Sequence, residues 1–117
     1  MKQVYIVIRL NRYYETKAAL TENNFFSLSS KEVLGRGRNG VDFATGEGQD
    51  INQKIDHPFV AKKMLEIFCR DEDVDKLIEV VKSVNQTGNP GDGKIFVIDV
   101  EDGTRIRTGE SGVNAIM

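Results

Sequence analysis

Two glycine-rich stretches contain the residue types from which proteins build anion-binding sites. Residues 35–40 read GRGRNG, and residues 88–94 read GNPGDGK. Glycine lets main-chain N–H groups approach a ligand closely, and nearby cations supply partners for phosphate or carboxylate. The candidate cations are Arg38, Lys94, Arg105 and Arg107. Ordinary turns flanked by solvated arginines are the alternative, because turns also favour glycine.

Neither stretch fits the nucleotide-binding motif that its letters suggest. Residues 35–40 match G-x-G-x-x-G, but no helix is expected after them to hold a pyrophosphate at its N-terminus. Residues 88–94 match the beginning of a P-loop, but Ile95 stands where that motif needs Ser or Thr. This loop also leads from a helix into a strand, which reverses the order of a P-loop. The sequence therefore predicts anion binding without a Rossmann or Walker site.

The elements that must position these residues form two strand–helix–strand units. The predicted strands span residues 2–9, 25–34, 59–69 and 94–100, and the predicted helices span 11–22 and 71–86. We expect Asn11 to cap the first helix and Asn23-Asn24 to end it. The acidic run 71–73 is expected to begin the second helix, whose apolar stripe is the clearest in the chain.

This element order predicts an α+β fold. Two such units fit a ferredoxin-like double βαβ sandwich, with an antiparallel sheet and both helices on one face. The strands 2–9 and 59–69 are apolar on both faces, so we expect further copies of the chain to cover the second face. The glycine-rich residues from 35 to 58 are expected to form a long recognition loop.

Composition restricts the class of function. With 16 Lys and Arg against 18 Asp and Glu, the formal net charge is −2, which argues against nucleic acid as a partner. The single cysteine, Cys69, is expected to be a small buried hydrophobe and suits a reducing cytoplasm. A ferredoxin-like hydrolase would need a nucleophile or a positioned water, and no such group of residues is readable. We therefore expect a protein that is not an enzyme.

Two long motifs resemble those of the PII nitrogen-signalling family. Residues 87–97 (TGNPGDGKIFV) are similar to that family's TG-x-x-GDGKIFV motif, and residues 105–110 (RIRTGE) resemble its tail. Residues 33–38 (VLGRGR) resemble the entry to its long T-loop. The resemblance covers residues 1–117 and implies one domain, with a T-loop at about 36–58 and a C-terminal segment at 101–117.

The resemblance implies a trimer of ferredoxin-like subunits that binds ATP or ADP in the clefts between subunits. It also implies that 2-oxoglutarate is sensed alongside Mg-ATP, without catalytic turnover. The implied nucleotide-binding residues are Ser29, Gly35, Gly37, Arg38, Glu66, Phe68, Gly91, Asp92, Gly93, Lys94, Arg105 and Arg107. Among these, Ser29, Glu66 and Phe68 fall where the family holds adenine and ribose, and the two tail arginines reach the phosphates from a neighbouring subunit.

The implied 2-oxoglutarate site contains Arg9, Asn39 and Lys62. Asn39 stands where the family usually has Gln, which helps to hold Mg²⁺. Asn keeps the amide oxygen but is one methylene shorter, so either the loop moves inward or the metal contact is lost. The loop also lacks tyrosine, which excludes control by tyrosine uridylylation there.

Shorter motifs resemble the PII proteins encoded beside nitrogenase genes. These motifs are residues 84–91 (VNQTGNPG) and 40–43 (GVDF). They imply a cytoplasmic regulator of dinitrogenase that works with a sister paralogue. The alternative is a PII protein whose T-loop plugs an ammonium transporter. An arginine at the loop tip would favour that alternative, and between Val41 and Pro58 the only cation is Lys54.

Overall fold

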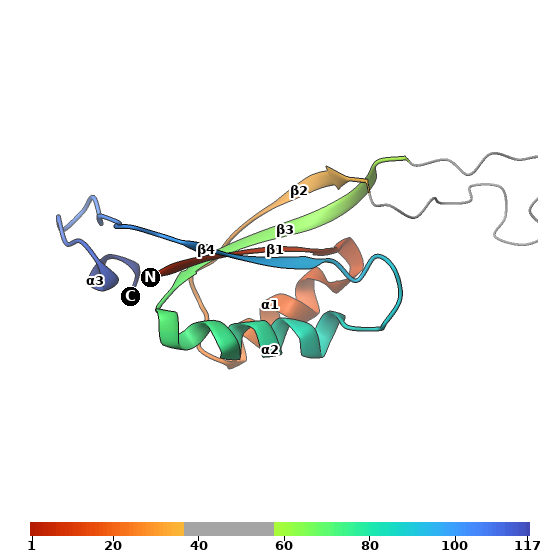
Figure 1. Cartoon of the computed structure of the whole chain (residues 1–117), viewed down its shortest axis with the longest axis horizontal. Helices are drawn as coiled ribbons and strands as arrows, with labels where there is room; N and C mark the ends of the chain where they lie inside the picture. The colour runs from red at the N-terminus through yellow and green to blue at the C-terminus, as the bar shows by residue number, and fades with distance from the viewer. Residues whose placement is uncertain (37–57) are drawn as a thin grey trace, which may run out of the picture.

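The structure, a computed structural model, describes residues 1–36 and 58–117 (Figure 1). Its elements are β1 (Lys2–Arg9), α1 (Tyr13–Glu22), β2 (Ser29–Gly35), β3 (Val60–Cys69), α2 (Val74–Asn85), β4 (Lys94–Asp99) and α3 (Val113–Ile116). Short 3₁₀ turns at Leu10–Arg12 and Asp71–Asp73 lead into α1 and α2. In the part of the chain that is described, no helix is long and apolar enough to cross a membrane.

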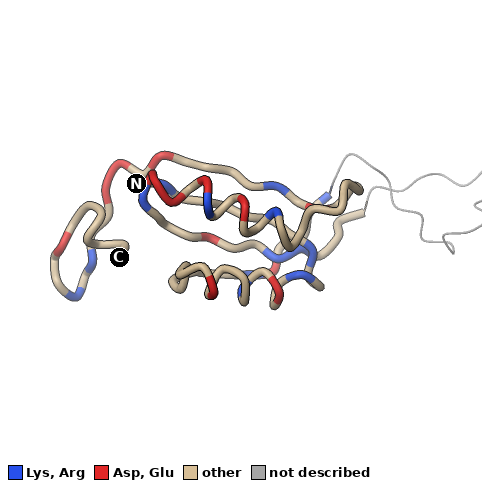
Figure 2. The backbone as a smooth tube through the Cα atoms, turned by 90° about the horizontal axis from the view of Figure 1, so that it is seen from below, with Lys and Arg blue, Asp and Glu red and all other residues tan. Residues whose placement is uncertain are grey.

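The four strands form one antiparallel sheet in the order β2-β3-β1-β4. β1 is central and pairs with β3 on one side and with β4 on the other. Both helices lie below the sheet in Figure 1, and Figure 2 views them from that side. This arrangement confirms the predicted ferredoxin-like α+β sandwich.

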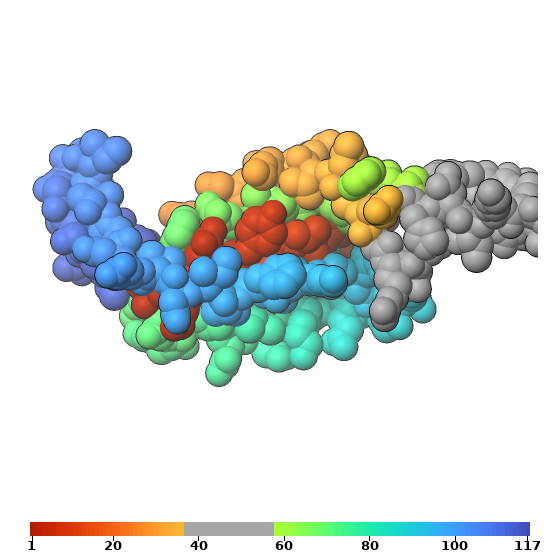
Figure 3. All heavy atoms as spheres, turned by 45° about the horizontal axis from the view of Figure 1, so that its top comes forward, coloured from red at the N-terminus to blue at the C-terminus, as the bar shows by residue number. Residues whose placement is uncertain are grey.

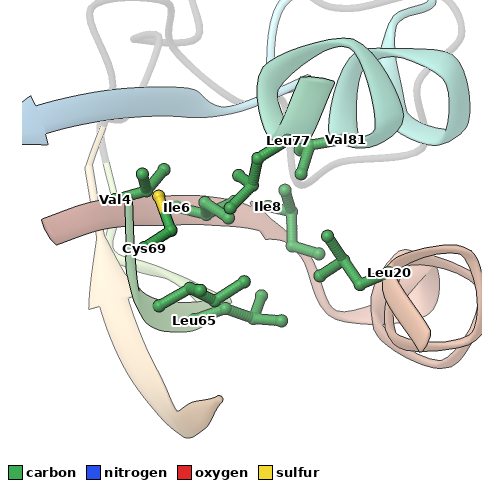
Figure 4. Packing of buried hydrophobic residues seen from close by; sticks show 9 residues of the cluster. Val4, Ile6, Ile8, Leu20, Leu65, Cys69, Leu77 and Val81 are labelled. Carbon is green, nitrogen blue, oxygen red and sulfur yellow. The ribbon is translucent and has the colours of Figure 1, made fainter. Parts of the chain in front are cut away.

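The hydrophobic core lies between the sheet and the two helices (Figure 4). The central strands β1 and β3 turn alternate side chains to this core, because successive residues of a strand point to opposite faces. The fully or nearly fully buried side chains are Val4, Ile6, Ile8, Leu20, Leu65, Ile67, Cys69, Leu77 and Val81. The predicted burial of Cys69 is confirmed, and this burial raises the pKa of its thiol.

A buried polar pair joins the two helices. The Asn85 side-chain amide donates to the Thr16 hydroxyl at 3.0 Å and to the Val81 carbonyl at 2.9 Å. The Thr16 hydroxyl donates in turn to the Arg12 carbonyl at 2.7 Å. Asn85 is the last residue of α2, so these bonds fix the point at which the chain leaves that helix.

The opposite face of the sheet carries no helix among the described residues, and we call it the open face. Figure 3 shows β1 in red between its neighbours, with no helix laid over it. Large apolar side chains remain partly exposed on this face, including Phe68, Phe96 and Ile98. Tyr5 and Phe96 contact each other there, with ring centroids 6.4 Å apart. The face is therefore partly apolar, and it also carries charged side chains such as Arg9, Lys62 and Lys94.

Two local predictions were wrong. Asn11 does not cap α1, because the chain enters that helix through a 3₁₀ turn and no side-chain cap bond is made. Residues 25–28 are not part of β2, since they connect α1 to the sheet while Phe25 and Leu28 pack against the core.

The predicted end of the first helix at Asn23-Asn24 is confirmed, and Asn24 has the left-handed φ of 68° that ends many helices. The short helix α3 was not predicted.

Candidate functional site

The sheet residues predicted to bind ligands all lie on the open face. Val4, Ile6 and Ile8 point to the core, so the residues between them point away from it. Directly paired residues share a face, and the register pairs Arg9 with Lys62. The registers of the three strand pairs place the remaining predicted sheet residues on the same face. The full set of predicted residues on the open face is Arg9, Ser29, Gly35, Lys62, Glu66, Phe68 and Lys94.

The loop between α2 and β4, residues 86–93, is organised by one carboxylate, and we call it the phosphate loop. Asp92 Oδ2 accepts bonds from the main-chain N–H groups of Thr87 at 2.7 Å and Gly88 at 2.9 Å. Its Oδ1 accepts a 2.5 Å bond from the Thr87 hydroxyl. These donors, led by the hydroxyl, hold the pKa of Asp92 well below its usual range. The predicted ligand-binding residue Asp92 therefore turns its carboxylate onto its own loop.

Glycine is required in this loop by the backbone itself. Gly88, Gly91 and Gly93 have φ values of 85°, 99° and 110°, which other residues rarely adopt. A Cβ on Gly93 would lie 1.9 Å from the Val7 carbonyl oxygen on β1. Glycine at position 93 thus allows the loop to pack closely against β1 of the same chain.

Arg9 and Lys62, the predicted 2-oxoglutarate cations, both contact the phosphate loop. Arg9 donates to Asp92 Oδ1 at 2.8 Å and to the Pro90 carbonyl at 2.9 Å. Lys62 Nζ donates to the Gly91 carbonyl at 3.1 Å. Burial, and then repulsion from Arg9, lower the pKa of Lys62. Arg9 and Lys62 thus lie near a single carboxylate, so the charges of these three side chains leave an excess of one positive charge.

A second group of predicted residues lines a cavity of about 550 Å³. Ser29 and Glu66 are directly paired across β2 and β3 on its floor, and Phe68 and Arg105 also line it. The Gln3 side-chain amide donates to Glu66 Oε2 at 2.6 Å, which satisfies part of that carboxylate. The cavity thus combines aromatic and aliphatic side chains with serine, glutamate and arginine, so that polar and apolar groups both line it. We call these residues the cavity group.

The phosphate loop and the cavity group are separated along the sheet. Lys62, beside the loop, and Glu66, in the cavity, are four positions apart along β3. At the rise of a β-strand this is about 13 Å. Gly35 lies further still from Ser29, at the end of β2 where it pairs with Val60. One chain therefore does not bring all the predicted residues together.

The remaining predicted residues are assigned to neither group. Gly37, Arg38 and Asn39 lie outside the described residues, as does most of the T-loop. Lys94 begins β4 on the open face, immediately after the phosphate loop. Arg107 is exposed in the C-terminal segment.

Sequence reasoning missed three features of the site. Thr87 was treated only as part of a motif. Its hydroxyl in fact donates to Asp92, five residues later, and this bond closes the loop. Gln3 was assigned only to a strand, yet it holds Glu66. The helix α3 has four residues, too few for helical periodicity to appear in the sequence.

The four-stranded antiparallel sheet with α1 and α2 on one face defines the protein as a ferredoxin-like α+β protein, and comparisons with known proteins specify the family. The sequence profile described as "Nitrogen regulatory protein P-II" matches residues 1–110. The "Nitrogen fixation nifHD region GlnB-like protein 2" of Methanobacterium ivanovii is 37% identical, with 100% of both chains covered. The "Nitrogen regulatory protein P-II 2" of Methanothermobacter thermautotrophicus is 40% identical, over 99% of this chain and 97% of that protein.

A solved structure agrees with these relatives. The structure titled "Structure of B. subtilis GlnK" superposes with a TM-score of 0.77 at 33% identity, covering 97% of this chain and 96% of that chain. The chain therefore belongs to the P-II family of nitrogen regulatory proteins. The resemblance on which the expected sites rest is thereby confirmed, and the sites themselves remain predictions.

Proposed function

We propose that this chain binds ATP or ADP in a cleft shared by two copies and senses 2-oxoglutarate beside the phosphates. The signal passes through the T-loop to an enzyme of nitrogen fixation. The observation that carries the proposal is the division of the predicted residues into two groups on one open face. Arg9 and Lys62 supply cations beside the phosphate loop, and the cavity group offers an aromatic ring and polar side chains for a nucleoside.

The separation of the two groups favours a shared site. In one chain the phosphate loop and the cavity are too far apart for the compact nucleotide site that the resemblance implies. A second copy, packed on the apolar open face, would bring its cavity group to the first copy's phosphate loop. Burial of Phe96 and Ile98 in the same contact would supply hydrophobic stabilisation.

Arg9 and Lys62 suit the carboxylates of 2-oxoglutarate. Both cations face the phosphate loop, so an effector held by them lies next to the proposed nucleotide phosphates. Asn39, with Mg²⁺ carried on ATP, is proposed to complete this effector site. Effector and nucleotide would then favour the same T-loop conformation, which requires that each binds that conformation more tightly than the others.

The first test is calorimetric titration of ATP and Mg²⁺, with and without 2-oxoglutarate. We expect 2-oxoglutarate to bind only when Mg-ATP is present, and Lys62→Met to abolish this second step. Lys82→Met is the matched control, since Lys82 lies exposed on α2, on the side of the sheet away from the open face. Absence of ATP binding by the unaltered protein would refute the proposal.

A mixing experiment tests whether two copies share the site. Lys94→Met disables the phosphate-loop half, and Glu66→Gln disables the cavity half while keeping an acceptor for Gln3. Each variant alone should bind ATP weakly. Coexpressed at equal levels in a trimer, they should restore roughly a quarter of the tight sites, since each half is intact with even odds. No restoration would place both halves in one chain.

The proposed target is dinitrogenase, in keeping with the nitrogen-fixation region in the names of the relatives. Deletion of residues 46–54 should leave ATP binding intact and abolish inhibition of purified dinitrogenase. Loss of ATP binding with the deletion would contradict this separation of sensing from output. Binding to vesicles that contain an ammonium transporter, without an effect on dinitrogenase, would instead identify the transporter-type regulator.

A further inference from the structure

A second cavity, of about 410 Å³, lies at the end of the sheet where α1 ends and α2 begins (Figure 1). It is lined by the connection after α1 (residues 23–27), the end of β3 (residues 67–70), and residues of α2 and of the chain end. We call it the helix-end cavity. Its volume falls within the range of small-molecule sites. Of the residues predicted to bind nucleotide or 2-oxoglutarate, only Phe68 lines it.

Lys76 supplies the one charge in the lining of this cavity that has no partner among the described residues. Arg70 and Asp73 also line the cavity, but Arg70 donates to Asp73 through Nε at 2.9 Å and through Nη2 at 3.2 Å. Lys76 is exposed and makes no hydrogen bond or ion pair within the described part of the chain. Its ammonium can therefore bind an anion without breaking an existing bond.

More than half of the lining surface of the helix-end cavity is apolar. Three of its large apolar side chains are uncovered, with Phe26 66%, Phe68 42% and Met117 67% exposed. Large apolar side chains around a hollow are stabilised when an apolar ligand removes them from water. The cavity therefore suits a ligand that combines one anionic group with an apolar body.

The helix-end cavity adjoins the cavity that contains the cavity group. The residues that line both are Phe26, Ser27, Phe68, Ile116 and Met117. A ligand in either cavity thus contacts side chains that also line the other. Ordering these exposed side chains costs conformational entropy, and a second ligand does not repeat that cost.

We propose that the helix-end cavity binds a small carboxylic acid with an apolar body. Lys76 binds the carboxylate, and the aromatic and aliphatic side chains cover the body of the ligand. Occupation of the cavity raises the affinity for nucleotide through the side chains that the two cavities share. This coupling rests on the proposed nucleotide site, whereas the binding of the acid does not.

The first test is an NMR titration of the full-length, isotope-labelled protein with phenylpropionate, which carries one carboxylate and one ring. Amide signals of residues 23–27 and 67–76 should shift, with a dissociation constant in the millimolar range that is usual for so small a ligand. Propionate lacks the ring and should bind more than about 10-fold more weakly. Phenylpropanamide lacks the charge and should bind about 3- to 5-fold more weakly.

Variants of Lys76 test the carboxylate contact. Lys76→Gln should weaken phenylpropionate about 3- to 5-fold and remove the difference between the acid and its amide. Lys76→Arg keeps the charge and should restore most of the affinity. Lys82→Gln is the matched control, because Lys82 is exposed on the same helix and lines neither cavity. It should leave the binding of phenylpropionate unchanged.

The coupling is measured with both ligands. Saturating phenylpropionate should tighten the binding of ATP about 2- to 5-fold, and saturating ATP should tighten phenylpropionate by the same factor, as linkage requires. Phenylpropionate alone should raise the methyl order parameters of Ile116 and Met117, because their side chains line both cavities.

Different results would overturn the two parts of the proposal. Equal affinity for the acid and the amide, or unchanged affinity in Lys76→Gln, would overturn the site. Competition between phenylpropionate and ATP would overturn it too, because the acid would then occupy the nucleotide cavity. An ATP affinity that does not respond to phenylpropionate would overturn the coupling alone. Binding of phenylpropionate without any binding of ATP would refute the proposed function and leave the helix-end site in place.

Discussion

In the phosphate loop the Asp92 carboxylate accepts hydrogen bonds from main-chain N–H groups. In the C-terminal segment, by contrast, the Arg105 guanidinium donates hydrogen bonds to main-chain oxygens. Asp92 accepts bonds from Thr87 and Gly88 and still pairs with Arg9. Arg105 donates to two carbonyls of its segment. The loop also contains glycines with positive φ, and at Gly93 it packs against the Val7 carbonyl of β1. The C-terminal segment is closed by its own main-chain bonds together with the Arg105 guanidinium. The loop is thus tied to the sheet, whereas the described bonds of the segment lie within residues 101–117.

The largest expected effect comes from the backbone of the phosphate loop. Gly93→Ala should lower the free energy of unfolding by about 3–5 kcal/mol, since the Cβ combines a strained φ with a main-chain clash. The clash is with the Val7 carbonyl, at the centre of the sheet. Urea unfolding measures the loss.

Gly88→Ala is the matched control for this substitution. Gly88 also has a positive φ, but no atom lies within 4 Å of its Cβ position. It should cost about 1 kcal/mol, the strain alone. Equal losses at the two glycines would show that contact with β1 is not what fixes the loop.

The next effect concerns acid stability. The folded-state pKa of Asp92 is lowered, so its carboxylate stabilises the fold above the unfolded pKa of about 3.9. This stabilisation is lost progressively as the pH falls below about 4. Urea midpoints from pH 7 to 2.5 should show a difference between the unaltered protein and Asp92→Asn that shrinks in acid.

Asp75→Asn provides the comparison for the acid experiment. Asp75 is exposed on α2, and its side chain makes no bond within the described ranges 1–36 and 58–117. Its substitution should leave the urea midpoint nearly unchanged at every pH. A pH-independent difference for Asp92→Asn would mean that the carboxylate's charge does not hold the loop.

The smallest effect is expected at Lys62. Burial and Arg9 lower its pKa, so the fold disfavours its charge at neutral pH. Lys62→Met should therefore raise the urea midpoint slightly at pH 7, and the gain should shrink as the pH rises and Lys62 loses its proton. A lowered midpoint would show that the bond from Lys62 to the Gly91 carbonyl outweighs the burial of its charge.

The regular elements of the fold could be predicted from the sequence because their residue patterns repeat along each element. The alternation in β1 and the apolar stripe of α2 each involve several residues, so a single exception does not hide them. Alternation within one strand places Lys62 and Glu66 on the same face, whereas placing Arg9 beside Lys62 needs the register of β1 on β3. The family motifs located the phosphate loop and the arginines, although they did not show what each side chain contacts.

Features that depend on single tertiary contacts could not be predicted from the sequence. The start of β2 depends on how residues 25–28 pack beneath the sheet, and their β-branched and aromatic neighbours gave no sign of this. The inward turn of Asp92 depends on its reach to Thr87 and Arg9. The capture of α3 by Arg105 joins residues nine and twelve positions apart, beyond any local propensity.

The shared face of the binding residues limits how the length of the sheet can change. Lys62 and Glu66 point the same way because an even number of positions separates them. Inserting one residue between them would turn one of the two into the core, and core residues such as Leu65 would be turned outward. Inserting two would restore the facing, although it would shift the register against β1. Insertions and deletions in this strand should therefore be accepted only in pairs.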